Sequence, residues 1–150
     1  MGELTGREED YLKAILELTK TKGYARIKDI AMKVNVTPAS TVGMMKKLSK
    51  KKYVDYRKYE GITLTESGMI HAEAITKRHE IFRKFLRIIC VPDQVAKKDA
   101  HILEHQLDPK TIIQFKKFVE FITSAKERPR IVPRLMEMFK KFSDEADRPN

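Results

Sequence analysis

The sequence His101-Ile102-Leu103-Glu104-His105 carries two imidazoles and a carboxylate within five residues. On a helix, side chains three and four positions apart share one face, so His101, Glu104 and His105 can converge on one ligand. Imidazole nitrogens and carboxylate oxygens are ligands that proteins offer to divalent transition metals. We therefore predict a metal-binding helix here, with the alternative that these are chance neighbours on an exposed helix.

The same five residues match the H-x-x-E-H signature of inverted zinc proteases, in which two histidines hold zinc and the glutamate activates water. Such an enzyme also needs a third protein ligand and a substrate cleft, and this chain has only 150 residues. We expect no enzyme and no catalytic residues, and a zinc hydrolase is kept as a distant alternative.

Two further residues are candidates for the same metal. His79 shares the helical spacing of Ile75, Phe82 and Leu86, so its ring is expected to point into the interior. Asp10 lies beside the apolar stripe of the first predicted helix, where an acid needs a partner. The alternatives are a hydrogen-bonded core histidine at 79 and, at 10, an acid that favours its helix N-terminus through the dipole.

The elements that must position these residues begin with a helix-rich N-terminal part. Thr5 and Glu8 have the spacing of a capping box and predict a helix that ends near Gly23. A short strand is expected over 24–27 and a brief second helix over 27–34.

A third helix and a hairpin are predicted next. Thr37 as cap and Pro38 at the first helical position predict a helix over 38–51. The β-rich segments 53–57 and 62–64 predict a hairpin. Helix, turn, helix and hairpin in this order are typical of a winged helix-turn-helix, in which the later helix enters the DNA major groove.

The predicted reading helix has small outer residues, which allow close approach to base pairs. Basic residues also gather between 46 and 58, a segment that contains seven lysines and arginines and a single acidic residue, Asp55. The alternatives are that this cluster is a solvated face and that the small residues only start a helix. The predicted DNA-binding residues are Thr37, Pro38, Ser40, Thr41 and Lys46 on the helix, with Arg57 and Lys58 on the wing.

The second half is predicted to be entirely helical. One long helix is expected over 66–89, others begin near Asp93 and Pro109, and a last amphipathic helix follows Pro133. We therefore expect a mainly α fold with a small β-wing, divided into a winged helix-turn-helix over 1–72 and a helical metal-binding and dimerisation domain over 73–150. The apolar stripe from Ile112 to Ile122 is either the dimer face or internal core.

Composition agrees with a DNA-binding protein. The formal charge of +10 suggests a polyanionic partner, because lysines and arginines release counterions when they replace them along a phosphate backbone. A single cysteine, Cys90, forms no intramolecular disulfide. With no apolar run long enough to cross a bilayer and no secretory signal at the N-terminus, we expect a cytoplasmic protein and no membrane partner.

Several segments together resemble the diphtheria toxin repressor family, nearest its short manganese transport regulator type. The resemblance covers nearly the whole chain. It implies an N-terminal winged helix and a helical dimerisation domain, with Asp10, His79, Glu104 and His105 at metal-ligand positions. The segments that carry it are Asp10-Tyr11, Gly23 to Ala31, Val36 to Val42, Tyr59 to Thr65, Arg78-His79-Glu80, Phe85 to Ile89 and Leu103-Glu104-His105.

The departures from the family pattern bear on the metal. Lys13 stands where manganese-type members carry a second carboxylate, and His101 stands where they carry Glu or the iron type carries Cys. Arg83 and Lys97 replace positions that build an ancillary site in the iron type. We therefore expect one principal site, rich in imidazole, with Asp10, His79, His101, Glu104 and His105 as its ligands.

The resemblance implies a homodimeric regulator, expected to be a repressor, that binds double-stranded operator DNA of metal-homeostasis genes when loaded with a divalent transition metal. The expected ions in the cell are Fe²⁺ or Mn²⁺, with Zn²⁺, Co²⁺ and Ni²⁺ as further candidates. A winged-helix regulator that no metal controls is the alternative.

Overall fold

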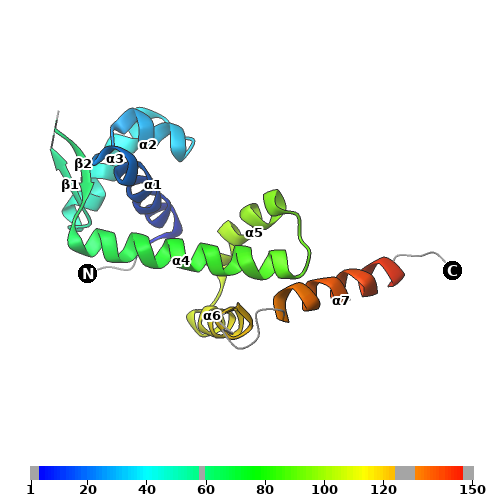
Figure 1. Cartoon of the computed structure of the whole chain (residues 1–150). Helices are drawn as coiled ribbons and strands as arrows, with labels where there is room; N and C mark the ends of the chain where they lie inside the picture. The colour runs from blue at the N-terminus through cyan, green and yellow to red at the C-terminus, as the bar shows by residue number, and fades with distance from the viewer. Residues whose placement is uncertain (1–3, 58–59, 124–130, 147–150) are drawn as a thin grey trace. The chain divides into compact units, whose positions relative to one another are not determined.

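The computed structural model describes residues 4–57, 60–123 and 131–146. The chain divides into two compact units, Met1–Thr76 and Lys77–Asn150. The elements in order are α1 (Gly6–Lys22), α2 (Ile27–Lys33), α3 (Pro38–Lys50), β1 (Val54–Arg57), β2 (Gly61–Leu64), α4 (Glu66–Ile88), α5 (Asp93–Gln106), α6 (Pro109–Thr123) and α7 (Ile131–Ala146) (Figure 1). The mainly α fold with a small wing is confirmed.

Local signals begin and end the first helices as predicted. Thr5 caps α1 in a capping box with Glu8, and Gly23 ends the helix in a left-handed conformation, with φ of 77°. Thr37 caps α3 and accepts a hydrogen bond from the Ser40 backbone, with Pro38 at the start of the helix. These caps satisfy backbone N–H groups that would otherwise have no partner.

The wing is an antiparallel pair of strands in which Val54 faces Leu64 and Arg57 faces Gly61. The strand predicted over 24–27 is reduced to one residue, because only Ala25 pairs with the sheet. It exchanges backbone hydrogen bonds of 2.8 and 2.9 Å with Ile62. This bridge ties the loop between α1 and α2 to the base of the wing.

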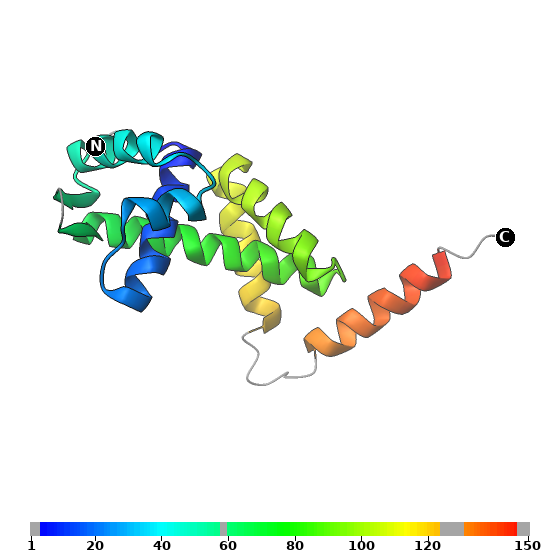
Figure 2. The same ribbon diagram turned by 90° about the horizontal axis from the view of Figure 1, so that it is seen from above.

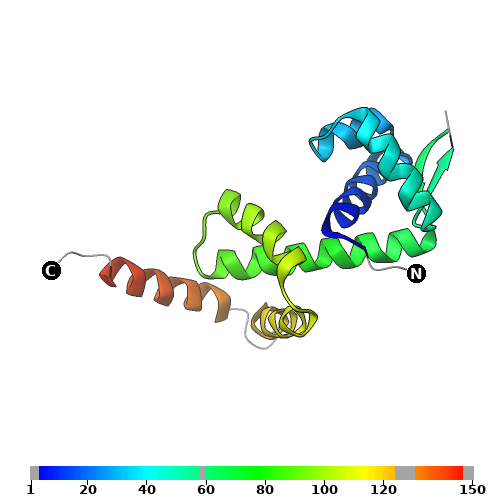
Figure 3. The same ribbon diagram turned by 180° about the vertical axis from the view of Figure 1, so that it is seen from behind.

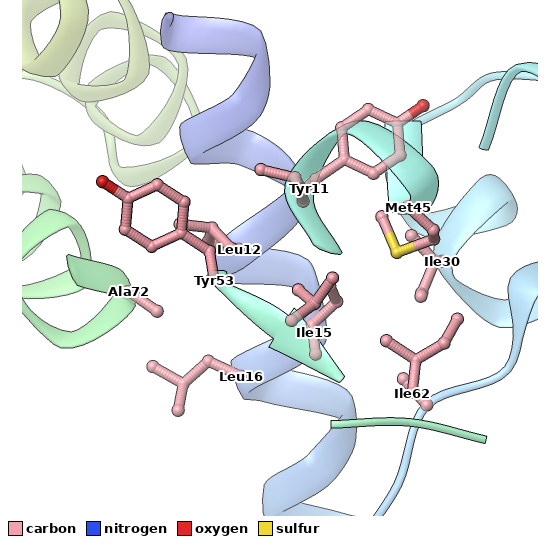
Figure 4. Close-up of a cluster of buried hydrophobic side chains, with 12 residues drawn as sticks. Tyr11, Leu12, Ile15, Leu16, Ile30, Met45, Tyr53, Ile62 and Ala72 are labelled. Atoms are coloured by element: carbon pink, nitrogen blue, oxygen red, sulfur yellow. The ribbon is translucent and has the colours of Figure 1, made fainter. Parts of the chain in front are cut away.

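A single apolar core holds the first unit together. Side chains from α1, α2, α3 and the sheet meet in it, and the buried aromatic rings are Tyr11 and Tyr53 (Figure 4). Its other members include Leu12, Ile15, Leu16, Ile30, Met45, Leu48, Ile62 and Ala72. The helical spacing of the α1 residues lets one face of that helix supply four of them.

The second unit is helical throughout its described part. Figures 2 and 3 show α5 folding back beside the second half of α4, with α6 crossing that half. Phe82 of α4 is fully buried, and its ring lies edge-on to Phe115 of α6 at 5.4 Å. No helix in the described residues is both long and apolar enough to cross a bilayer.

One expectation for the second unit needs correction. Pro133 does not precede the last helix but lies in the first turn of α7, where the missing N–H has no intrahelical acceptor to lose. Within the Ile112 to Ile122 stripe, Val119 and Ile122 are buried and contribute to the core of the second unit, and a role of the stripe in dimerisation stays a prediction. The apolar residues of α6 that remain exposed are Ile113, Phe118 and Phe121.

Candidate metal centre and DNA-reading surface

A fully buried carboxylate, Glu104 of α5, lies among three imidazoles. His79 Nδ1 lies 2.8 Å from Glu104 Oε2, while His101 Nδ1 and His105 Nε2 lie 3.1 and 3.3 Å from Oε1. Ring nitrogens therefore contact both carboxylate oxygens. Burying an ionised carboxylate is unfavourable unless it is paired or binds a metal, so this grouping needs a charged or proton-donating environment.

Helix geometry produces this grouping. The i, i+3, i+4 spacing puts His101, Glu104 and His105 on one face of α5, and α4 supplies His79 from the adjacent helix. Arg78, next to His79, donates a hydrogen bond of 2.8 Å to the backbone carbonyl of Glu104. The facing turns of α4 and α5 are thus held together by both a side chain and a backbone contact.

A second contact fixes the start of α5 on α4. Arg83 binds Asp93 with both ends of its guanidinium, at 3.1 and 2.6 Å. The hydrogen bond from Arg83 holds the pKa of the Asp93 carboxyl below its ordinary value, so Asp93 is ionised near neutral pH. Bidentate arginine–carboxylate pairs are geometrically specific, and this one sets the position from which α5 carries its histidines.

The donor set fits a divalent transition metal. Ligand atoms of His101, Glu104 and His105 lie within 4.8 Å of one another, a spacing over which small side-chain rotations can bring them to one ion. His79 and His105 are 13 and 14% exposed, whereas His101 is 49% exposed, which makes His101 the open side of the group. The fifth predicted ligand, Asp10, is a half-buried residue of α1 in the other unit.

On the predicted reading helix, four of the five predicted DNA-binding residues are exposed. They are Thr37, Pro38, Ser40 and Lys46. The Thr37 hydroxyl donates to Ser40 Oγ at 3.0 Å, so the two polar side chains lie together at the beginning of α3. This is the end of the helix that a helix-turn-helix directs toward base edges.

Thr41 does not face outward as expected. It is fully buried, and its hydroxyl donates to the Thr37 carbonyl at 3.1 Å. The neighbouring positions 40 and 41 are about 100° apart around a helix, so only one of them can lie on the outer face. Thr41 therefore supports the cap from inside.

The wing offers one described basic residue. Arg57 is exposed at the end of β1 and pairs with Glu60 at 3.3 Å. Lys58, the other predicted wing residue, lies outside the described residues.

Sequence reasoning missed a buried ion cluster on the reading helix. Glu8 of α1 is fully buried, and its Oε1 lies 3.2 Å from Lys47 Nζ and 2.8 Å from Lys51 Nζ. Burial by itself raises the pKa of Glu8, but hydrogen bonds from Lys51, the Thr5 backbone and Lys47 outweigh it and lower the pKa to about 2. The only sequence signal was that Lys47 and Lys51 stand four apart; nothing local links them to Glu8.

Two family models match consecutive parts of the chain. The model described as "Iron dependent repressor, N-terminal DNA binding domain" matches residues 3–62. The model described as "Iron dependent repressor, metal binding and dimerisation domain" matches residues 65–139. The first range contains the reading helix and most of the wing, and the second contains Glu104 with its three histidines.

Curated proteins and solved structures give the same picture. The chain is 38% identical over 120 residues to the HTH-type transcriptional regulator MntR of Bacillus pumilus, covering 80% of this chain and 83% of that protein. It is 35% identical over 129 residues to MntR of Oceanobacillus iheyensis, covering 86 and 88%.

Among solved structures, the manganese regulator SloR superposes with a TM-score of 0.67 at 30% identity, covering 76% of this chain and 54% of that one. T. acidophilum IdeR superposes with a TM-score of 0.65 at 29% identity, covering 79 and 55%. This chain therefore spans about half the length of these two solved chains.

Proposed function

Since this chain belongs to the iron-dependent repressor family and is a metal-dependent, DNA-binding transcriptional regulator of metal homeostasis, we propose that metal bound around Glu104 controls its hold on operator DNA. The resemblance to the diphtheria toxin repressor family, of manganese transport regulator type, is confirmed by these matches. The chain carries the family's dimerisation domain, and its cofactor is a divalent metal such as Mn²⁺ or Fe²⁺. The observation that carries the proposal is a fully buried carboxylate contacted by three imidazoles.

The proposed ligands are His79, His101, Glu104 and His105, completed by Asp10. A divalent cation, when bound, accepts their lone pairs and neutralises the buried negative charge of Glu104. Arg78 and Arg83 hold α5 on α4 and so keep the ligands of the second unit in register before any ion arrives. Support for Asp10 comes from the carboxylate that the family carries at this position of its first helix.

The proposed switch follows from how the ligands divide along the chain. Residues 1–72 would form the DNA-reading module, which contains Asp10, and residues 73–150 the metal-binding and dimerisation module. Ligands shared by both modules restrict the hinge between them and so the separation of the two reading heads of a dimer. Half-sites on DNA require one separation, about 34–36 Å or a multiple of it.

The proposed DNA contacts are made by the exposed residues at the start of α3 and by the wing. Thr37, Pro38 and Ser40 would approach base edges, Lys46 would contact a phosphate, and Arg57 with Lys58 would reach the backbone or the minor groove. The proposed compartment is the cytoplasm, the compartment in which we expect the protein to meet its operator DNA.

Gly43 provides a test of how closely α3 approaches DNA. It is exposed in mid-helix, and a Cβ there would meet no atom within 4 Å beyond its chain neighbours and the adjoining backbone of its own helix. Gly43→Ala should raise the free energy of unfolding by about 0.5–1 kcal/mol, because alanine favours the helix. The same methyl should weaken operator binding by about 10-fold or more, equivalent to about 1.4 kcal/mol. Urea unfolding and fluorescence anisotropy measure the two effects, and unchanged operator affinity would refute a close approach at this position.

The imidazole-rich ligand set should affect metal choice. His101→Glu replaces a borderline nitrogen ligand with a hard oxygen ligand at the most exposed position of the group. We expect the affinity for Mn²⁺ to rise by about 10-fold relative to that for Co²⁺ or Zn²⁺, because carboxylate oxygen suits Mn²⁺ and imidazole nitrogen suits the other two ions. Competition against a fluorescent chelator measures this ratio. An unchanged or reversed ratio would exclude His101 as the residue that sets metal preference.

The proposed function is tested with DNA that the protein itself selects. The wild-type chain, loaded with Mn²⁺ or anaerobically with Fe²⁺, is used to enrich duplexes from a random-sequence library. The affinity for the enriched duplex is then compared with metal and with chelator. We expect metal to tighten binding by about 5- to 150-fold. Equal affinities would instead favour a winged-helix regulator that no metal controls.

The family consists of transcriptional regulators, and we propose that this chain has no catalytic role. The H-x-x-E-H pattern is here explained by a regulatory metal site. Peptide hydrolysis by the zinc-loaded protein that disappears in Glu104→Gln would support the hydrolase alternative instead.

A further inference from the structure

Glu8 is a charged residue that neither the proposed metal site nor the proposed DNA contacts use. Its carboxylate is fully buried, yet it lies near the start of α1, where carboxylates are usually exposed caps. Oε2 accepts hydrogen bonds from the Thr5 backbone at 2.8 Å and from Lys51 Nζ at 3.0 Å. Oε1 pairs with the ammonium groups of Lys47 and Lys51, whose Nζ atoms lie 3.2 and 2.8 Å away.

Burying the Glu8 carboxylate carries a large unfavourable free energy of desolvation, which argues that this residue does more than cap a helix. Desolvating a carboxylate costs several kcal/mol, and only good geometry with its partners offsets this. The capping box alone needs one side-chain oxygen of Glu8, which the Thr5 N–H engages. The two lysines are an addition from a different part of the chain, because Lys47 lies in the last turn of the DNA-reading helix and Lys51 is its C-terminal cap.

The cluster joins α1 directly to α3 in a defined orientation. α3 packs its backbone on α2 and on β1. Apolar side chains of α1 and α3, among them Leu12 and Leu48, share the common core, and such packing is non-directional and tolerates small rotations. By contrast, two ammonium groups one helical turn apart on one carboxylate fix both the rotation and the axial position of α3.

Lys47 also lies next to the proposed DNA-contacting face. Its side chain is 54% exposed, whereas that of Lys51 is 26% exposed, and its neighbour Lys46 is one of the proposed phosphate contacts. A shift of α3 about the Glu8 anchor would therefore displace the residues that meet the DNA.

We propose that Glu8 is a positioning residue that fixes the DNA-reading helix α3 on α1 through Lys51 and Lys47. When metal binding fixes the position of α1, these ion pairs fix the position of α3 with it. The proposal rests on the proposed function, because it takes α1 as the helix through which metal acts. It assigns Glu8 no contact with DNA and no contact with metal.

The test compares Glu8→Gln with Glu73→Gln, which removes the same charge from an exposed position of α4. For each variant and the wild type, anisotropy measures affinity for the enriched duplex with Mn²⁺ and with chelator, and a chelator competition measures the affinity of the protein for Mn²⁺. We expect Glu8→Gln to keep its Mn²⁺ affinity but to lose at least about fivefold of the factor by which Mn²⁺ tightens operator binding. Glu73→Gln should behave as wild type.

Binding to a random-sequence duplex separates loss of position from loss of fold. Glu8→Gln frees Lys47 and Lys51, so its affinity for random duplex should be equal to or higher than that of wild type, with a steeper dependence on salt. A Glu8→Gln protein that unfolds at a lower temperature but retains the full Mn²⁺-dependent factor would show that Glu8 only stabilises the fold, and would overturn the proposal.

Lys51→Gln gives a second route if Glu8→Gln does not fold, since Glu8 then keeps Lys47 as a partner. It should lose part of the Mn²⁺-dependent factor, and the exchanged pair Glu8→Lys with Lys51→Glu should recover some of what either single change loses. Full retention of the factor in Lys51→Gln would also contradict the proposal. A wild-type chain whose operator affinity ignores Mn²⁺ would refute the proposed function itself, an outcome distinct from either of these.

Discussion

Glu104→Gln is expected to reduce the operator affinity of the metal-loaded protein to that of the metal-free protein, a loss of about 5- to 150-fold. All three imidazoles contact Glu104, which is fully buried. Glutamine has nearly the same shape but no negative charge. The variant therefore keeps the packing of α5 on α4 while removing the anionic donor at the centre of the group.

The affinity of Glu104→Gln for metal should also fall, by about 100-fold or more, because changes around metal ligands alone can lower metal affinity by up to about 100-fold. Chelator competition and anisotropy on the same preparation measure both quantities. Glu120→Gln is the matched control, because Glu120 makes an exposed ion pair with Lys116 on α6 and surface pairs contribute little. If Glu104→Gln bound metal and operator as the wild type does, the buried group would be only structural.

Gly68→Ala should produce the largest loss of stability in the first unit, about 3 kcal/mol or more. Gly68 lies in the first turn of α4, and a Cβ there would lie 1.9 Å from the Tyr53 carbonyl oxygen and 2.9 Å from its carbon. That carbonyl also accepts the Thr65 N–H at 3.1 Å, just before β1 begins. Relieving the clash requires moving a backbone that anchors both the wing and α4.

Thermal or urea unfolding measures this loss, with Gly43→Ala as the control in which the added methyl meets open space. Because the wing begins one residue after Tyr53, we also expect Gly68→Ala to bind operator weakly with metal present. A Gly68→Ala protein with wild-type stability would mean that α4 and β1 do not approach as closely as the structure has them.

Features with a local cause could be predicted from the sequence. The capping box of Thr5 with Glu8 and the Thr37–Pro38 start of α3 need only residues a few positions apart, and both occur as expected. The histidine and glutamate triplet on α5 is local as well, so its common face followed from helical spacing.

Features that join distant segments could not be predicted in this way. The pairing of Glu8 with Lys51 spans 43 residues, and the contact of Gly68 with Tyr53 depends on how a helix meets a strand. Helical spacing predicted only that His79 points into the interior, and nothing local relates α4 to α5, so its contact with Glu104 could not be derived from spacing alone. Thr41 was misplaced because adjacent helical positions differ in face by an amount that apolar patterning resolves poorly.

The most direct test of the central claim measures the affinity of the wild-type protein for Mn²⁺, and anaerobically for Fe²⁺, with and without saturating enriched duplex. If metal at the Glu104 group and DNA at the reading helix stabilise the same state, each must tighten the other by the same factor. We predict that duplex lowers the metal dissociation constant by about 5- to 150-fold and that Glu104→Gln abolishes this effect. Identical metal affinities with and without DNA would contradict it.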